Sequence, residues 1–106
     1  MADRLVHVLA FITAKPGQRD KVLAAFRMNR PNVLAEAGCV EYQAVVDVPD
    51  VGPIQTPLGP DSFVVVEKWA DMAAFKAHAA APHMADYGAK TKEFVAKREI
   101  RVLQGA

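Results

Sequence analysis

The chain has 106 residues, of which 52% are hydrophobic and 24% charged, and its 13 Lys and Arg residues nearly balance its 12 Asp and Glu residues. A chain of this length folds around one hydrophobic core, so we expect residues 1–106 to form a single domain without disulfide or metal support. The net charge of +1 and the single cysteine, Cys39, argue against a nucleic-acid-binding protein, a disulfide scaffold, a zinc ribbon and an iron–sulfur protein.

The sequence lacks the patterns of membrane and targeting segments. No apolar segment approaches the roughly 18 residues that span a bilayer. The N-terminal segment carries acidic Asp3 and a strand-like run in place of a signal-peptide core. We therefore expect a cytoplasmic protein with no membrane partner. No glycine-rich phosphate-binding motif occurs, and the chain is too short for a full dinucleotide-binding unit.

The first half of the chain predicts a strand, a helix and a second strand. Residues 5–13 form a β-branched, apolar run that ends at a Lys-Pro-Gly turn. Residues 18–37 show apolar residues at helical spacing, and Pro31 predicts a kink or two helical pieces. Gly38 is expected to close this helix in a left-handed conformation. Residues 40–48 alternate partly and predict the second strand.

The second half begins with a long loop over residues 49–60, which holds four of the seven prolines. Its remaining elements are a strand over 62–69, a helix over 72–80 after an N-cap at Asp71, a helical segment over 82–95 and a strand over 98–104.

The order strand, helix, strand, strand, helix, strand predicts an α+β fold of the ferredoxin-like βαββαβ type, with the helices on one face of an antiparallel sheet. The strand over residues 5–13 is apolar on both of its faces, yet the helices can cover only one face of the sheet. The other face needs a cover, and a second copy of the chain is the simplest one. We therefore predict a homodimer packed sheet to sheet.

The strand over residues 62–69 places Phe63, Val65, Glu67 and Trp69 on one face. A carboxylate between large apolar groups allows two interpretations. In a structural one, Glu67 pairs with an arginine such as Arg101 and Trp69 belongs to the core. In a functional one, Trp69 forms a wall of an aromatic-binding cavity, and Glu67 acts as a polar orienter or a base with raised proton affinity.

Three histidines are candidates for proton transfer near neutral pH. His7 lies in an apolar strand, which favours a structural role. His78 lies three residues after Phe75 and shares a helix face with it, so His78 is our preferred base. His83 follows Pro82 at a helix start, where capping or surface exposure is common and the helix dipole disfavours a charged imidazole.

Other chemistries find weaker support. The histidines have no metal-ligand spacing such as HExxH, so we expect no metal site. Ser62 lies in no glycine-flanked nucleophile elbow, and Cys39 resembles a small buried residue more than a nucleophile. Tyr42 and Tyr87 could donate hydrogen bonds to a substrate oxygen, although structural tyrosines are more common.

The segment PDSFVVVEKWADMAAFKAHAAAPHMADY, with EAGCVEYQ before it and IRVLQ at the end, resembles the antibiotic biosynthesis monooxygenase family. Within that family, the order and spacing of these segments are most similar to those of bacterial quinol monooxygenases. The resemblance implies a dimeric α/β barrel built from ferredoxin-like subunits. Haem-degrading members carry an Asn on the first strand, together with a Trp and a His late in the second helical region. This chain has His7 on the first strand and Tyr87-Gly88 at the late position, so haem degradation is not expected.

The resemblance further implies oxygenation of a quinol, phenol or polycyclic aromatic by dioxygen, without flavin, haem or metal. A base removes a phenolic proton, the anion passes an electron to dioxygen, and the recombined peroxide collapses to a quinone. By this resemblance the expected roles are ring binding by Trp69 and Phe75, with Phe63 on the same strand face; proton abstraction by His78 or Glu67; and orientation of the oxygen by Tyr87 or His83.

Two other functions remain open from the sequence. The segment FRMNR at residues 26–30 somewhat resembles a motif of family members that isomerise a phosphorylated signalling sugar. A third possibility is a dimer that binds a small molecule without catalysis. An isomerase would turn over without oxygen, which separates it from the oxygenase.

Overall fold

Four antiparallel strands form one sheet in the order β2-β3-β1-β4, and three helices accompany them. The computed structural model describes residues 4–106. Its elements are β1 (Val6–Ala14), α1 (Arg19–Leu34), β2 (Cys39–Val45), β3 (Ser62–Trp69), α2 (Met72–Ala79), α3 (Pro82–Thr91) and β4 (Val95–Gln104). This order and topology confirm the predicted α+β, ferredoxin-like arrangement, and the bounds of β3 match those that the sequence predicts.

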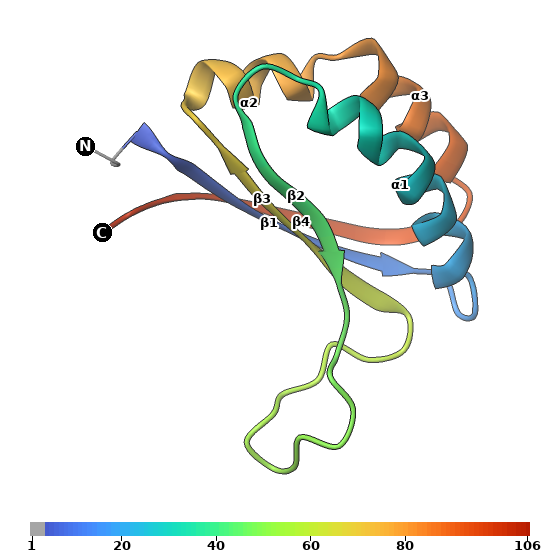
Figure 1. The fold of residues 1–106 in the computed structure, drawn as a ribbon. Coiled ribbons are helices and arrows are strands. Elements are labelled where there is room, and N and C mark those ends of the chain that lie inside the picture. Colours follow the sequence, from blue (N-terminus) through green and yellow to red (C-terminus); the bar gives the residue numbers. More distant parts are fainter. Residues whose placement is uncertain (1–3) are drawn as a thin grey trace.

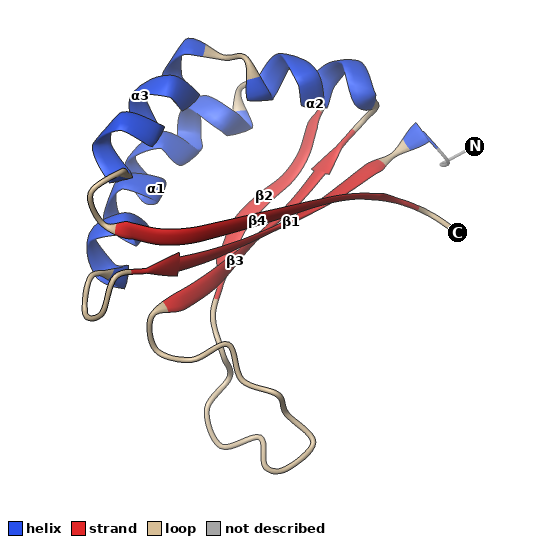
Figure 2. Ribbon diagram, turned by 180° about the vertical axis from the view of Figure 1, so that it is seen from behind, coloured by secondary structure: helices blue, strands red, loops and turns tan. Residues whose placement is uncertain are grey.

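All three helices lie on one side of the sheet, whose other side is bare in the described part of the chain (Figures 1 and 2). The core sits between these two layers. In β1 the buried residues Val6, Val8, Ala10 and Ile12 alternate with half-buried ones, as a strand with one face on the core requires. No helix within residues 4–106 is long and apolar enough to cross a membrane.

The first helix differs from its prediction at both of its discussed positions. Of the two outcomes predicted at Pro31, two helical pieces is wrong, because α1 is a single element that runs through Pro31, whose carbonyl accepts a hydrogen bond from Ala35 N (3.1 Å). The helix ends at Leu34, so Gly38 does not cap it. Gly38 does adopt the predicted left-handed conformation, with φ of +84°.

Tertiary pairing sets the other boundaries that the sequence misplaces. β2 ends at Val45, because pairing with β3 stops there and the Asp47 carboxylate instead accepts hydrogen bonds from the backbone of Leu58 (2.9 Å) and Gly59 (3.0 Å). The loop that follows projects away from the sheet (Figure 1). Val95 was predicted to be helical, but it pairs with β1 and begins β4.

Candidate active site

A cavity of about 300 Å³ lies between the sheet and the helices. Its floor consists of apolar side chains of β1 and β3, including Val8, Ala10 and Val65, and Phe75 of α2 and Met84 of α3 contribute to its helical side. This volume is at the small end of the range of about 300–1,000 Å³ for ligand pockets. The cavity therefore suits a small, largely apolar ligand.

Glu67 provides a carboxylate at one end of the cavity. Strand alternation directs its side chain from β3 toward the helices, where Glu67 is only 6% exposed. Trp69 Nε1 donates a hydrogen bond to Glu67 Oε1 (3.0 Å). Burial raises the pKa of the Glu67 carboxyl, against the smaller lowering effects of the Trp69 hydrogen bond and the nearby His78. A carboxylate in this setting binds protons more readily than one at the surface.

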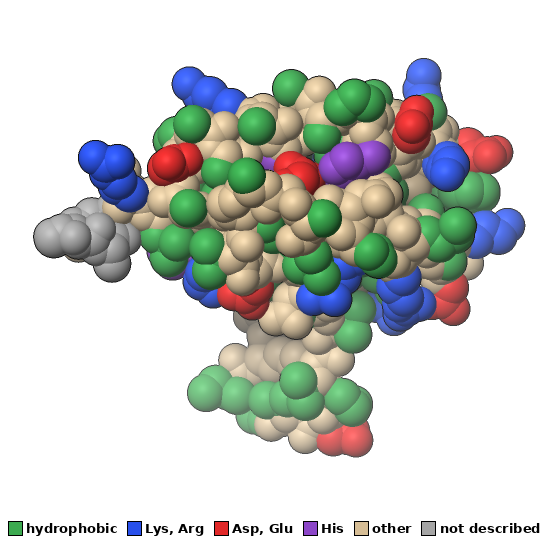
Figure 3. All heavy atoms as spheres, turned by 45° about the horizontal axis from the view of Figure 1, so that its top comes forward, with side chains coloured by type: hydrophobic (Ala, Val, Ile, Leu, Met, Phe, Trp, Pro, Cys, Tyr) green, Lys and Arg blue, Asp and Glu red, His purple; other side chains and the backbone are tan. Residues whose placement is uncertain are grey.

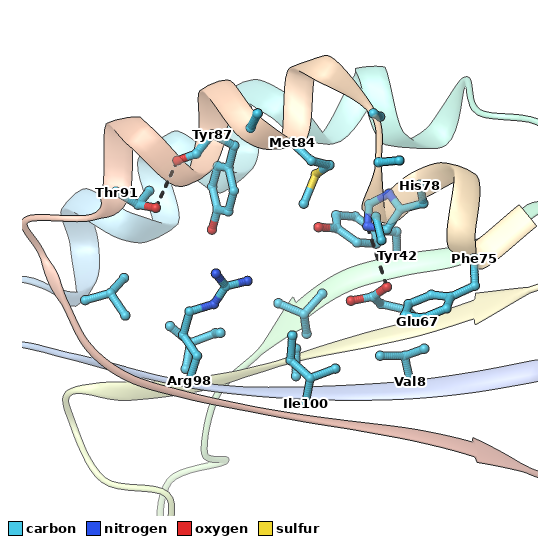
Figure 4. Close-up of a pocket in the computed structure, with 18 residues that line it drawn as sticks. Val8, Tyr42, Glu67, Phe75, His78, Met84, Tyr87, Thr91, Arg98 and Ile100 are labelled. Atoms are coloured by element: carbon cyan, nitrogen blue, oxygen red, sulfur yellow. Dashed lines mark hydrogen bonds and ion pairs between the residues drawn. The ribbon is translucent and has the colours of Figure 1, made fainter.

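His78 lies beside Glu67 in the same end of the cavity (Figure 4). It is buried on α2, whose N-terminus is capped by the Asp71 side chain accepting from Ala74 N (2.9 Å). The imidazole stacks on the Trp69 indole, with ring centroids 4.5 Å apart. His78 Nε2 is 3.9 Å from Glu67 Oε1, which is an ion-pair distance but too long for a direct hydrogen bond.

A second carboxylate, that of Glu36, lies behind His78. Glu36 Oε2 is 2.9 Å from His78 Nδ1 and also 2.9 Å from His83 Nε2. Asn29 Nδ2 in turn contacts His83 Nδ1 (3.1 Å). Glu36 could not be recognised from the sequence, because its partner His78 is 42 residues away along the chain.

The opposite end of the cavity contains Tyr87 of α3 and Arg98 of β4, whose polar groups point toward one another (Figure 4). Burial raises the pKa of the Tyr87 hydroxyl, and the Arg98 charge partly opposes this effect. Tyr42 also lines the cavity, and burial followed by the charge of Glu67 raises its pKa. At neutral pH both tyrosines are therefore hydroxyl groups that can donate hydrogen bonds.

A family model for antibiotic biosynthesis monooxygenases matches residues 5–90, which is most of the chain. The chain belongs to this family. Among its relatives is the protein named "Probable quinol monooxygenase YgiN" of Escherichia coli K12, which is 38% identical over 102 residues that cover 94% of this chain and 97% of the relative.

Solved structures agree with the family's fold. PA3566 of Pseudomonas aeruginosa superimposes with a TM-score of 0.80 at 24% identity, covering 100% of this chain and 98% of the other. Rv0793 of Mycobacterium tuberculosis gives a TM-score of 0.78 at 21% identity, covering 96% and 95%. At these identities the structures bear on the fold alone. Family membership and the Escherichia coli relative support a monooxygenase-type activity.

Four of the residues proposed for the site of this family member line the cavity, namely Glu67, His78, Phe75 and Tyr87. Three other predicted site residues do not line the cavity. Trp69 and Phe63 are fully buried in the core, Trp69 behind Glu67 and His78. His83 lies on the far side of Glu36 from His78.

The predicted ion pair between Glu67 and Arg101 does not form. The strand register pairs Arg101 with Leu9 and therefore places it on the face away from Glu67, whose hydrogen-bond donor is Trp69. The arginine that reaches the cavity is Arg98, which was not among the predicted site residues. Within residues 4–106, no group of three or more His, Cys, Asp or Glu side chains is arranged to hold a metal ion.

Proposed function

We propose that this chain is a cofactor-independent monooxygenase that oxidises a quinol or a related phenolic aromatic with dioxygen. The observation that carries the proposal is a small apolar cavity with the Glu67 and His78 pair at one end and Tyr87 and Arg98 at the other. Apolar walls suit a flat ring, and the two polar ends suit the two oxygens of a hydroquinone. The name of the Escherichia coli relative is consistent with this substrate class.

His78 acts as the base in this proposal. A substrate hydroxyl about 2.8 Å from both His78 Nε2 and Glu67 Oε1 fits the 3.9 Å gap between these atoms. His78 Nε2 accepts the phenolic proton, and the resulting imidazolium lies between the carboxylates of Glu67 and Glu36, which stabilise its charge.

The substrate itself supplies the electrons. The phenolate passes an electron to dioxygen, the two radicals combine at a ring carbon, and the peroxide loses water. Overall, a hydroquinone and one O₂ give a hydroxyquinone and one H₂O. One oxygen atom of O₂ becomes the new hydroxyl group on the ring, the other leaves as H₂O, and the hydroquinone is oxidised to the quinone. The protein needs only to bind the ring, accept the proton and limit access of water.

We also propose that two copies pair through the uncovered face of the sheet. Leu103 on that face is 45% exposed, and Ile100 and Val102 on the other face of β4 are 51% and 44% exposed. An edge strand with apolar residues exposed on both faces is typical of an interface between subunits.

Sedimentation velocity tests the homodimer. We expect Leu103→Glu to shift the protein to monomer, because it places a charge in the proposed interface. The matched control is Leu34→Glu on α1, where the leucine is equally exposed at 45% but lies on the helical side. A wild-type protein that sediments as a monomer at micromolar concentration contradicts the pairing.

Dioxygen consumption with a menadiol-like hydroquinone tests the activity. The proposal expects consumption above the rate of autoxidation, and its loss in His78→Ala. The surface variant Glu93→Gln serves as the control, since this exposed acid lies outside the cavity. Wild-type protein that does not accelerate oxygen uptake with any of a panel of one- and two-ring quinols contradicts the proposal.

The two alternative functions give different results in the same assay. A sugar-phosphate isomerase would turn over anaerobically, whereas a binding protein would show affinity without turnover. The FRMNR segment offers the isomerase no support at the cavity, because Phe26 is buried in the core, Met28 is 77% exposed and Arg30 donates to the backbone oxygen of Tyr42 (2.6 Å).

A further inference from the structure

Glu36 occupies a position that local helix energetics do not explain. It follows the C-terminus of α1, where the helix dipole disfavours a carboxylate, and α1 has no basic residue in its last turn to offset the charge. Nevertheless the Glu36 side chain is only 16% exposed. A largely buried carboxylate at the C-terminal end of a helix requires a compensating interaction elsewhere in the fold.

The turn that carries Glu36 is held against α2. A Cβ atom on Gly38 would lie 2.5 Å from the Cβ of Ala74, so only glycine allows this close approach. Ala70 N also donates a hydrogen bond to Gly38 O (2.8 Å). Because α2 carries His78, this packing brings the Glu36 carboxylate to the imidazole.

The Glu36 carboxylate contacts both nearby histidines, but the two contacts differ. Its Oε2 makes a hydrogen bond with His78 Nδ1 at 2.9 Å. Its approach to His83 Nε2 is equally short but not aligned, and this buried nitrogen has no hydrogen-bond partner among the described residues. The aligned contact with His78 is therefore the stronger one.

His83, which lies on the far side of Glu36 from His78, is oriented by Asn29. Asn32 Nδ2 donates to Asn29 Oδ1 (3.1 Å), which turns the Asn29 amide nitrogen toward His83 Nδ1. A neutral His83 then carries its proton on Nε2, on the side of Glu36. Figure 3 shows histidine side chains reaching the surface on the helical side of the molecule, next to an acidic side chain.

We propose that Glu36 is a positioning residue that acts through His78. Its carboxylate accepts the Nδ1–H of His78 and so fixes the tautomer whose unprotonated Nε2 faces Glu67 and the cavity. The same carboxylate stabilises the imidazolium that forms when Nε2 accepts a proton. The role of Glu36 in turnover rests on the proposed function, whereas its control of the tautomer does not.

Nitrogen NMR of the full chain, labelled with ¹⁵N-histidine, tests the tautomer directly. In the wild type we expect neutral His78 to carry its proton on Nδ1. Glu36→Ala should give a mixture of tautomers. A neutral His78 with its proton on Nε2 in the wild type would overturn the proposal, and this reading requires no variant to fold.

Glu36→Gln provides the matched variant for activity. Its side chain keeps an oxygen that can accept from Nδ1 of His78 but removes the charge of the carboxylate.

Kinetics then separate this role from the proposed function. We expect Glu36→Gln to lower kcat about 10- to 100-fold with little change in KM, Glu36→Asp to restore part of the loss, and Glu93→Gln to match the wild type. If Glu36 controls the His78 tautomer but the wild type consumes no oxygen, the proposed function fails while the positioning stands. If the wild type is active and Glu36→Gln retains full kcat, the positioning role fails while the proposed function stands.

Discussion

The hydrogen bond from Trp69 to Glu67 should contribute measurably to stability, and Trp69→Phe removes it. The indole is fully buried, so the variant leaves a buried carboxylate without its donor. A hydrogen bond to a charged group contributes about 1.5–3 kcal/mol, and the smaller ring costs roughly 1 kcal/mol more through lost packing. We therefore expect the free energy of unfolding to fall by about 3 kcal/mol.

Urea denaturation followed by circular dichroism measures this loss at a fixed protein concentration, because Trp69 is the only tryptophan and fluorescence is lost with it. A double-mutant cycle with Glu67→Gln isolates the hydrogen bond. The cost of Trp69→Phe should fall by about 1 kcal/mol in the Glu67→Gln background, since the donor then faces a neutral oxygen. Costs that add to within about 0.3 kcal/mol would refute the contribution assigned to this bond.

Three further predictions follow from the same geometry. Burial raises the folded pKa of Glu67 above its ordinary value of 4.5. The stability of the wild type relative to Glu67→Gln should therefore be greatest below pH 4.5 and decline as pH rises through the folded pKa. Urea titrations from pH 4 to 8 that show a constant difference in stability would count against this. Gly38→Ala should lower the free energy of unfolding by about 2–4 kcal/mol, because the new methyl group overlaps Ala74. Gly17 is also at positive φ, but a Cβ atom there would have nothing within 4 Å, so Gly17→Ala should cost only about 1 kcal/mol. Equal costs in thermal melts would argue against the close packing of the turn at Gly38. Arg98→Ala should raise the pKa of Tyr87 further, as measured by ultraviolet titration of the phenol, and should raise KM for a quinol roughly 10-fold; an unchanged titration would place the Arg98 charge away from the hydroxyl.

The local geometry of single strands and helices explains why Glu67, His78 and Phe75 could be predicted from the sequence. In a strand with one face on the core, the period of two puts Glu67 and Trp69 on the same side without any knowledge of the partner strands. Helical spacing similarly placed His78 and Phe75 on one face of α2. These inferences need only the local geometry of one element.

The remaining features depend on how elements pack against one another. Choosing between Arg98 and Arg101 requires the register of β4 on β1, which alternation within β4 does not give. Glu36 reaches His78 through the left-handed turn at Gly38 and its contact with α2. The sequence predicted that turn conformation, but it carried no sign of the distant helix that the turn contacts.

The proposed chemistry is tested most directly by supplying ¹⁸O₂ to the wild-type protein with a menadiol-like hydroquinone and analysing the product at once by mass spectrometry. We expect a hydroxyquinone that carries one ¹⁸O atom, formed faster than without protein and only slowly by His78→Ala. An unlabelled quinone accompanied by hydrogen peroxide would show oxidation without oxygen insertion and would contradict the proposed function.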